Sequence, residues 1–467
     1  MIGECSIKSF QNQLLNNDTS LESSVIQLFA EIKEKDVSIN SFVNLYEDQS
    51  ILKAQEIDQK LKSGASLGKL FGSVISIKDN ICYQDHPVTA SSAILKDFKP
   101  IYSSTAVERL LAEDAIIIGS TNCDEFGMGS SNENSVYGTV SNPNDLSKVA
   151  GGSSGGAAAS VAAGFCHVAI ASDTGGSVRQ PAAFCGVLGF KPSYGRVSRY
   201  GLLAYASSFD QIGILALYPE DISLVLSVIE GKDEFDSTVC NSYLSSLNKN
   251  GSKVAFIRHS GESSQAKKAM DQAYKVLNDN GIICESAILK QFDYMVPSYY
   301  IIAMAEASSN LSRYDGIHYG VRPDNINDLN ELYTETRTAG FGTEVKRRIM
   351  TGSFILSAGY YEAYYKKAQK VRRLLVDEVI EILNDYDYLI MPVSNHSAFT
   401  KGEKVDPVEV YQSDKYTVLA NMCGLPAISI PLSKTENGLP FALQVHANQF
   451  QDNSLLEFGQ KLKNILQ

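Results

Sequence analysis

Two glycine- and serine-rich turns, joined by an alanine-rich segment and a strand-like run, dominate the middle of the sequence. The first turn is Gly151-Gly152-Ser153-Ser154-Gly155-Gly156, and residues 157–163 after it are all alanine, serine or valine. Alanine is the strongest helix former, so the pattern predicts a tight loop that leads into a closely packed helix; a flexible linker would continue in polar residues. A P-loop is disfavoured because Ala157 and Ala158 stand where that motif needs Lys and Ser or Thr.

The second turn follows the strand-like run 167–171 and contains Asp173-Thr174-Gly175-Gly176-Ser177. Glycines at a strand-to-helix turn leave several backbone N–H groups open in one direction, which suits the stabilisation of a developing oxyanion. A serine at the end of such a turn is placed to act as a nucleophile on a carbonyl carbon. Taken alone, Ser177 fits an ordinary helix N-cap, the commoner role of a single serine. The other serine-glycine loop, one helix away, favours the interpretation of Ser177 as a nucleophile.

A nucleophilic serine needs a base, and the six histidines of this chain stand in no recognisable active-site context. A lysine that burial keeps neutral is the alternative. Lys78 is the candidate, because it ends the apolar run 74–77 and precedes a polar loop. A surface lysine paired with Asp79 is the competing interpretation. Under the first interpretation, Ser153 can carry a proton between Lys78 and Ser177.

Short apolar runs alternate with helical patterns over most of the chain, which predicts an α/β fold. Apolar residues recur at helical spacing over 20–65, and this segment is expected to form an N-terminal helical layer. The further strands are expected at 74–77, 115–118, 167–171, 253–257, 282–284 and 388–391, and the further helices at 106–113, 264–280 and 371–384.

The chain of 467 residues is acidic, with 41 Lys and Arg against 53 Asp and Glu and a net charge of −12. This balance disfavours direct contact with nucleic acid, because the basic clusters at 346–348 and 366–373 are diluted by apolar or acidic neighbours. No apolar run reaches the roughly 18 to 20 residues that span a bilayer. The eight cysteines form no Cys-x-x-Cys pair. We expect a cytoplasmic protein without membrane contact, and any RNA to be held by a partner.

These motifs resemble the amidase signature family. The resemblance rests on Gly151 to Gly156, on Asp173 to Ala183 and on Gly189 to Ser198 in that order, with Lys78-Asp79-Asn80 upstream. It implies a Ser-cisSer-Lys triad of Ser177, Ser153 and Lys78, and an oxyanion hole of the backbone amides of Thr174, Gly175, Gly176 and Ser177. The implied fold is an amidase domain over 66–467, with the signature region at 150–210. In it, helices cover both faces of a central mixed β-sheet, and residues 1–65 pack on this core.

Within that family the chain is similar to the A subunits of tRNA-dependent amidotransferases, through segments 124–131, 199–213, 305–316 and 357–368. The likeness implies a glutaminase that sends ammonia to a partner, which amidates Glu-tRNA(Gln), Asp-tRNA(Asn) or both. Expected partners are B-type and C-type subunits in a heterotrimer. ATP and Mg²⁺ are expected in the partner subunit, and neither a metal nor an organic cofactor in this chain. A free-standing amidase of the same Ser-Ser-Lys type and a binding subunit without turnover are the alternatives.

Free glutamine requires an arginine for its α-carboxylate and a carboxylate for its α-ammonium group, both recessed from water. In the resembling subunits these roles correspond to Arg348 and Asp414, with Tyr299 lining the pocket. Arg347 stands next to Arg348 and is the alternative for the first role.

The chain departs from the family's usual sequence at three places. Residues 214–217 are Ile-Leu-Ala-Leu instead of Pro-x-Thr/Ala-Arg, 391–396 replace a Pro-Thr-x-Pro-x motif, and 415–421 replace a stretch that normally holds Thr-x-Pro-x-Asn. None of the three contains a triad residue. We expect them to affect the glutamine pocket or the contact with a partner.

Overall fold

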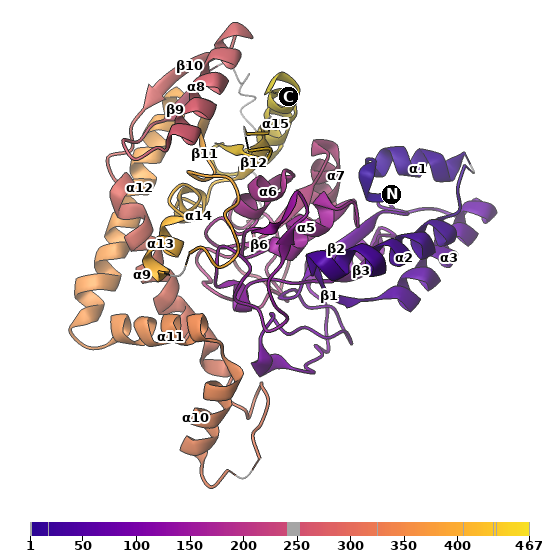
Figure 1. Ribbon diagram of the computed structural model, residues 1–467, viewed down its shortest axis with the longest axis horizontal. Coiled ribbons are helices and arrows are strands. Elements are labelled where there is room, and N and C mark those ends of the chain that lie inside the picture. The colour runs from indigo at the N-terminus through magenta and orange to yellow at the C-terminus, as the bar shows by residue number, and fades with distance from the viewer. Residues whose placement is uncertain are drawn as a thin grey trace.

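Within the residues that the structure describes, eleven strands form one mixed β-sheet (Figure 1). The computed structural model describes residues 2–16, 18–240, 253–324, 326–404, 406–432, 434–435 and 437–466. The strand order is β1-β3-β2-β6-β8-β7-β12-β13-β11-β9-β10. The strands are β1 (Phe42–Leu45), β2 (Val74–Lys78), β3 (Ile116–Thr121), β6 (Val168–Asp173), β7 (Leu188–Lys191), β8 (Gln211–Ala216), β9 (Lys253–Ile257), β10 (Ile283–Ala287), β11 (Tyr388–Pro392), β12 (Ala427–Pro431) and β13 (Ala442–His446), and a separate pair consists of β4 (Ser141–Asn142) and β5 (Asp145–Val149).

The strands run in both directions. The pairings β3–β2–β6 and β11–β9–β10 are parallel, whereas the pairings from β6 through β8, β7, β12 and β13 to β11 are antiparallel. Parallel neighbours need a crossover connection, and the helix α4 lies between β2 and β3 in the chain as α8 lies between β9 and β10. The expected α/β class with a central mixed sheet is confirmed.

Helices cover both faces of this sheet. Alternate residues of β2 point to opposite faces: Ile75 and Ile77 join a core with residues of α4, α7, α8 and α15, and Val74 joins a core with residues of α2, α3 and α5. The helices are α1 (Ile7–Leu15), α2 (Leu21–Ile39), α3 (Glu47–Ser63), α4 (Thr105–Ala112), α5 (Gly155–Ala162), α6 (Arg179–Cys185), α7 (Pro219–Ile229), α8 (Ser264–Asp279), α9 (Phe292–Asn310), α10 (Leu329–Gly340), α11 (Thr343–Leu356), α12 (Lys366–Asp385), α13 (Pro407–Gln412), α14 (Val418–Met422) and α15 (Asp452–Leu466).

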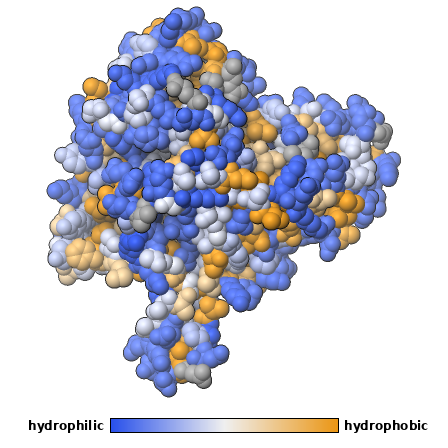
Figure 2. Space-filling model, in the orientation of Figure 1, coloured by the Kyte–Doolittle hydropathy of each residue, from blue (hydrophilic) through white to orange (hydrophobic). Residues whose placement is uncertain are grey.

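Figure 1 shows α1 to α3 together at one end of the molecule, α9, α11 and α12 at the other, and α10 projecting away from the body. The face seen in Figure 2 is mostly hydrophilic, with scattered apolar patches. Among the described residues, none of the helices combines the length and the apolar character needed to cross a lipid bilayer.

The N-terminal segment is less uniform than the sequence suggests. Helices are present over most of 20–65 as expected, but α2 ends at Ile39, its C-cap Asn40 has a left-handed φ of 62°, and β1 then pairs antiparallel with β3. The prediction of an all-helical segment is therefore wrong at β1. Aromatic Phe42 and β-branched Val43 favour the extended conformation there. The boundary at residue 65 stays a prediction.

The sheet topology brings two predicted site segments to one edge. Lys78 is the last residue of β2 and Asp173 the last of β6, and these two strands are parallel neighbours. Chain segments that follow such strands meet at the carboxyl edge of the sheet, where α/β proteins commonly bind ligands. The unusual residues 214–216 belong to β8 and are fully buried, so their apolar character suits a central strand.

Candidate active site

Lys78 is completely buried at the end of β2. Its Nζ donates hydrogen bonds to the hydroxyl oxygens of Ser153 at 2.8 Å, Ser154 at 2.9 Å and Ser172 at 3.0 Å. Burial lowers the pKa of Lys78 from its ordinary value of 10.5, against the opposing effect of nearby acidic groups. The interpretation as a surface lysine paired with Asp79 is wrong, because the Asp79 carboxylate accepts its hydrogen bonds from another loop.

The loop that carries Ser153 is held from two sides. The peptide bond between Gly152 and Ser153 is cis, as the family resemblance implies. The N–H of Gly152 donates to the side-chain oxygen of Gln180 at 2.9 Å, and the carbonyl of Ser153 accepts from the N–H of Asp124 at 3.0 Å. A Cβ on Gly152 would lie 2.2 Å from the Asp124 carboxylate, so this position has room only for glycine.

Ser177 lies in the second loop and is 8% exposed. Its carbonyl accepts a hydrogen bond from the N–H of Ser154 at 3.2 Å, so the two glycine-serine loops are in direct contact, as expected. The Ser177 hydroxyl has no hydrogen-bond partner among the described residues. Hydrogen bonds of a catalytic nucleophile are often long before substrate binds. The Lys78–Ser153 link is therefore formed, and the step from Ser153 to Ser177 stays a prediction.

The backbone of the second loop is fixed by Asp173. The N–H of Gly176 donates to the Asp173 carboxylate at 2.9 Å, and the Arg179 guanidinium donates to both carboxylate oxygens at 3.1 Å. Burial raises the pKa of Asp173, but the charge and hydrogen bonds of Arg179 outweigh it and lower this pKa to about 2. The Gly176 amide, expected in the oxyanion hole, is thus engaged by Asp173. Within the described residues the amides of Gly175 and Ser177 make no hydrogen bond.

Tyr299, on α9, packs against the same loop. Its side chain is 2% exposed, and a Cβ on Gly175 would lie 2.4 Å from its hydroxyl oxygen. The Tyr299 ring lies 5.2 Å from the ring of Phe209, centroid to centroid. The residue expected to line the substrate pocket therefore lies beside the predicted nucleophile loop.

Of the two adjacent arginines on α11, Arg348 is 3% exposed and Arg347 is exposed. Arg348 donates to the Glu344 carboxylate at 2.8 Å and to the Tyr205 hydroxyl at 2.7 Å. Its guanidinium lies over three tyrosine rings, those of Tyr205, Tyr300 and Tyr411. Arg347 pairs with Glu344 from the solvent side. The structure therefore favours Arg348 as the recessed cation.

Asp414 lies close to this arginine. Its carboxylate accepts hydrogen bonds from the Ser130 hydroxyl at 2.9 Å and from the Tyr300 hydroxyl at 2.5 Å. Burial raises the pKa of Asp414 to about 6, against the opposing effect of these hydrogen bonds and of Arg348. Tyr300 connects the two charges, because its hydroxyl binds Asp414 while its ring lies 5.3 Å below the Arg348 guanidinium.

The arrangement combines a buried amine, a hydrogen-bonded serine, a second serine among free amides, and a recessed pair of opposite charges. This set suits acyl transfer from an amide. Within the described residues, no group of three or more His, Cys, Asp or Glu side chains is arranged to hold a metal ion.

Comparison with known proteins gives the family: the Amidase family model matches residues 24–456. The chain belongs to the amidase family. Among amidase relatives, the A subunit of the glutamyl-tRNA(Gln) amidotransferase of Fusobacterium nucleatum subsp. nucleatum is 45% identical over 469 residues, covering 98% of this chain and 96% of the relative. The protein of the same name from Bacillus licheniformis is 45% identical over 459 residues, covering 96% and 94%.

Solved amidase structures agree with the fold. The crystal structure of the A subunit of the glutamyl-tRNA(Gln) amidotransferase from Thermotoga maritima matches with a TM-score of 0.79 and 36% identity, covering 98% of this chain and 93% of that one. The resemblance to the amidase signature family, and within it to such A subunits, is therefore confirmed.

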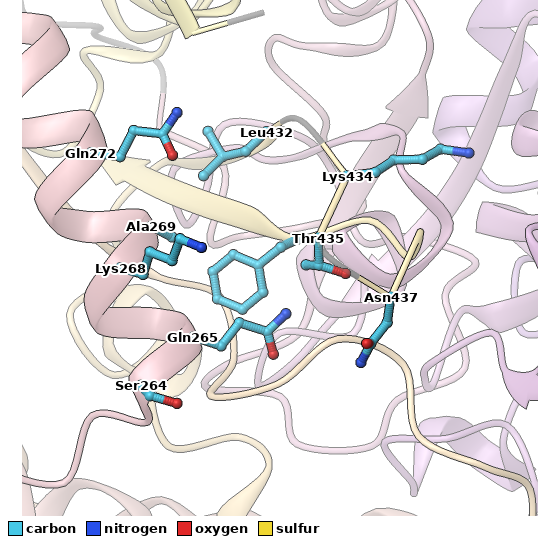
Figure 3. A pocket seen from close by; sticks show the side chains of 10 residues that line it. Ser264, Gln265, Lys268, Ala269, Gln272, Leu432, Lys434, Thr435 and Asn437 are labelled. Atoms are coloured by element: carbon cyan, nitrogen blue, oxygen red, sulfur yellow. The ribbon is translucent and has the colours of Figure 1, made fainter.

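This amidase also has a cavity of about 550 Å³ between α8 and the segment that connects β12 to β13 (Figure 3). Gln265 and Lys268 from α8 line one side, and Thr435 and Asn437 line the other. None of the predicted site residues lines this cavity.

Five residues around the recessed charges were not predicted. They are Tyr205, Tyr300, Tyr411 and Glu344, which contact Arg348, and Ser130, which shares Asp414 with Tyr300. Ser130 and Tyr205 lie in segments 124–131 and 199–213, which carry the likeness to A subunits, and this was a usable signal. Tyr300, Tyr411 and Glu344 lie one, three and four residues from the predicted Tyr299, Asp414 and Arg348, and of these only the Glu344–Arg348 contact, between positions i and i+4 of one helix, has a local signal.

Proposed function

We propose that the chain is the glutaminase subunit of a tRNA-dependent amidotransferase. It hydrolyses glutamine to glutamate and supplies ammonia to a partner subunit that amidates Glu-tRNA(Gln), Asp-tRNA(Asn) or both. The observation that carries the proposal is the buried pair of Arg348 and Asp414, joined through Tyr300. A free amino acid presents one charge to each of these groups, whereas a simple carboxamide presents neither. The names of the full-length relatives, which are A subunits of glutamyl-tRNA(Gln) amidotransferases, support the assignment to such an enzyme.

The proposed reaction begins with the neutral amine of Lys78. It accepts the hydroxyl proton of Ser153, which takes the proton of Ser177, and the Ser177 oxygen forms a bond to the side-chain amide carbon of glutamine. The carbonyl electron pair moves onto its oxygen. The backbone amides of Thr174, Gly175 and Ser177, which make no hydrogen bond among the described residues, donate hydrogen bonds to this oxyanion.

The oxyanion then collapses and breaks the carbon–nitrogen bond. The leaving nitrogen takes the proton back through Ser153, and ammonia departs from a γ-glutamyl ester of Ser177. Water gives a proton to the same relay and attacks the ester carbon. The carbon–oxygen bond to Ser177 breaks, Ser177 regains its proton, and glutamate leaves.

The partner subunits complete the proposed enzyme. We assign ATP and Mg²⁺ to the B-type subunit, because activation of the tRNA-bound carboxylate takes place where the ammonia arrives. The B-type subunit would also hold most of the tRNA, which agrees with the net charge of −12 on this chain. A C-type subunit completes the heterotrimer, and the expected location is the cytoplasm.

The test compares two nitrogen sources in the reconstituted heterotrimer. Ser177→Ala is expected to abolish glutamine-dependent amidation of mischarged tRNA and to preserve amidation from added ammonium. Ser353→Ala, on the exposed side of α11, is the matched control and should retain both. Full glutaminase activity in Ser177→Ala would overturn the mechanism. Brisk hydrolysis of simple amides by the isolated wild-type chain, without preference for glutamine, would favour the free-standing amidase instead.

A further inference from the structure

The peptide group that joins Gly175 to Gly176 is held at both ends by side chains. Its carbonyl oxygen accepts a hydrogen bond from the Thr417 hydroxyl at 2.5 Å, and its N–H donates to the Asp173 carboxylate at 2.9 Å. The C=O and N–H of a planar trans peptide point in opposite directions. Two partners on opposite sides therefore fix the rotation of this plane. The neighbouring amides of Gly175 and Ser177 share its Cα atoms, so their directions depend on it.

Thr417 is packed directly against this loop. Its side chain is completely buried, and a Cβ on Gly176 would lie 2.2 Å from its hydroxyl oxygen and 2.3 Å from its Cβ. Gly176 also has a left-handed φ of 125°, a conformation that favours glycine. Both the close approach of Thr417 and the backbone conformation therefore require glycine at position 176.

Asp173, which accepts the hydrogen bond from the Gly176 N–H, is itself bonded to the chain segment that carries Thr417. Asp173 accepts a hydrogen bond from the side-chain nitrogen of Asn421 at 2.9 Å, and Arg179 donates to the side-chain oxygen of Asn421 at 2.8 Å. Thr417 is the N-cap residue of α14 and Asn421 lies four residues later, on the same side of this short helix.

Thr417 is also bonded to Asp414, the residue proposed to bind the α-ammonium group of the substrate. Its backbone N–H donates to the carbonyl of Asp414 at 3.1 Å, so a single turn connects the carboxylate proposed for the α-ammonium group to the nucleophile loop. The expectation that 415–421 replaces the family's Thr-x-Pro-x-Asn needs correction. Thr417 and Asn421 keep the threonine and asparagine at that spacing, and only Leu419 differs.

We propose that Thr417 and Asn421 are positioning residues of the reaction. They hold the peptide between Gly175 and Gly176 so that the amides of Gly175 and Ser177 face the oxyanion. The Gly176 N–H holds this peptide to the Asp173 carboxylate. The inference rests on the proposed role of Ser177, and it assigns to the Asp414–Asn421 segment a second task besides substrate binding.

The experiment compares Thr417→Val, which replaces the hydroxyl by a methyl group of similar shape, with Thr417→Ser, which keeps the hydroxyl. Both are made in the heterotrimer. Glutaminase kcat and KM are measured together with the affinity for two ligands. One is L-glutamate, and the other is 2-amino-4-boronobutanoic acid, whose boron forms a tetrahedral adduct with a serine oxygen.

Loss of one oxyanion donor costs about 10²- to 10³-fold in kcat, so misalignment of the amides in Thr417→Val is expected to cost about 10- to 100-fold. The boronate should lose affinity by a similar factor, because it mimics the transition state. KM and the affinity for glutamate should stay near wild type. Thr417→Ser should restore kcat to within about threefold.

Two results would overturn the inference. One is a wild-type kcat and boronate affinity in Thr417→Val while Ser177→Ala is inactive, which leaves the proposed function standing. The other is an equal loss of glutamate and boronate affinity, because a positioning role weakens the tetrahedral adduct alone. Activity retained in Ser177→Ala would instead contradict the proposed function itself.

Discussion

The amine nitrogen of Lys78 lies 2.8 Å from the hydroxyl oxygen of Ser153, and no part of the lysine is exposed to water. A charged ammonium group is costly to bury, which is why the pKa of Lys78 is lowered. Two further hydroxyl oxygens, those of Ser154 and Ser172, surround the nitrogen. The site thus holds the lysine in place by neutral hydrogen bonds, which leaves it able to lose its proton.

Replacement of Lys78 by methionine keeps the stem of the side chain and removes the base. General-base catalysis is worth about 10²- to 10⁴-fold, so kcat for glutamine hydrolysis is expected to fall by that range with little change in KM. The base must be neutral, so wild-type kcat should decrease as the pH falls through the Lys78 pKa, and this acidic limb should disappear in Lys78→Met. Lys366→Met, at an exposed lysine, is the control. An unchanged pH profile in Lys78→Met would contradict the role.

Much of the nucleophile site could be predicted from the sequence because it is locally encoded. Ser153 and Ser177 stand on the loops before and after the α5–β6 unit, and Lys78 ends the strand that pairs with β6. Strand ends and glycine turns leave a signal in the sequence itself. The parallel pairing of β2 with β6 then brings the two loops and the lysine together.

The remaining contacts are tertiary and leave no local signal. The Thr417 hydroxyl bonds to the Gly175 carbonyl across 242 residues of chain, and the Ser130 hydroxyl reaches Asp414 across 284. The engagement of the Gly176 amide by Asp173 depends on one peptide rotation, which residue types do not specify. Strand β1 was missed for a related reason, because its pairing with β3 outweighs the helical pattern on either side.

Asp414 should make glutamine binding dependent on pH. Burial raises its pKa to about 6, and the ionised form is the one that attracts the α-ammonium group. Wild-type kcat/KM for glutamine is therefore expected to be lost as the pH falls below about 6, by about tenfold per pH unit once the carboxyl is mostly protonated. Asp414→Asn should raise KM about 10²-fold and abolish this part of the pH dependence. A KM for Asp414→Asn that equals the wild-type value at pH 7 would show that another group binds the ammonium.

The two neighbouring arginines form a matched pair for testing the carboxylate site. The buried guanidinium of Arg348 lies over three tyrosine rings, and its planar, forked set of donors suits a bidentate contact that lysine cannot make. Arg348→Lys is expected to raise KM for glutamine by at least about tenfold. Arg347→Lys, at the exposed neighbour, should stay within about twofold of wild type. Steady-state kinetics on both variants decides the assignment, and a larger effect at Arg347 would reverse it.

The buried ion pair of Arg179 with Asp173 should be required for folding as well as for the nucleophile loop, because both side chains are completely inaccessible to solvent. Arg179→Met leaves the Asp173 carboxylate buried without its cation, which typically costs about 3 to 5 kcal/mol in the free energy of unfolding. Arg373→Met removes an exposed ion pair with Asp377 and should cost less than about 1 kcal/mol. The pKa of Asp173 is lowered to about 2, so the stabilisation is present above the unfolded value of 3.8 and is lost as the pH falls towards 2. Urea denaturation of the two variants at neutral pH measures the difference, and equal midpoints would show that water or a neighbouring group replaces the guanidinium.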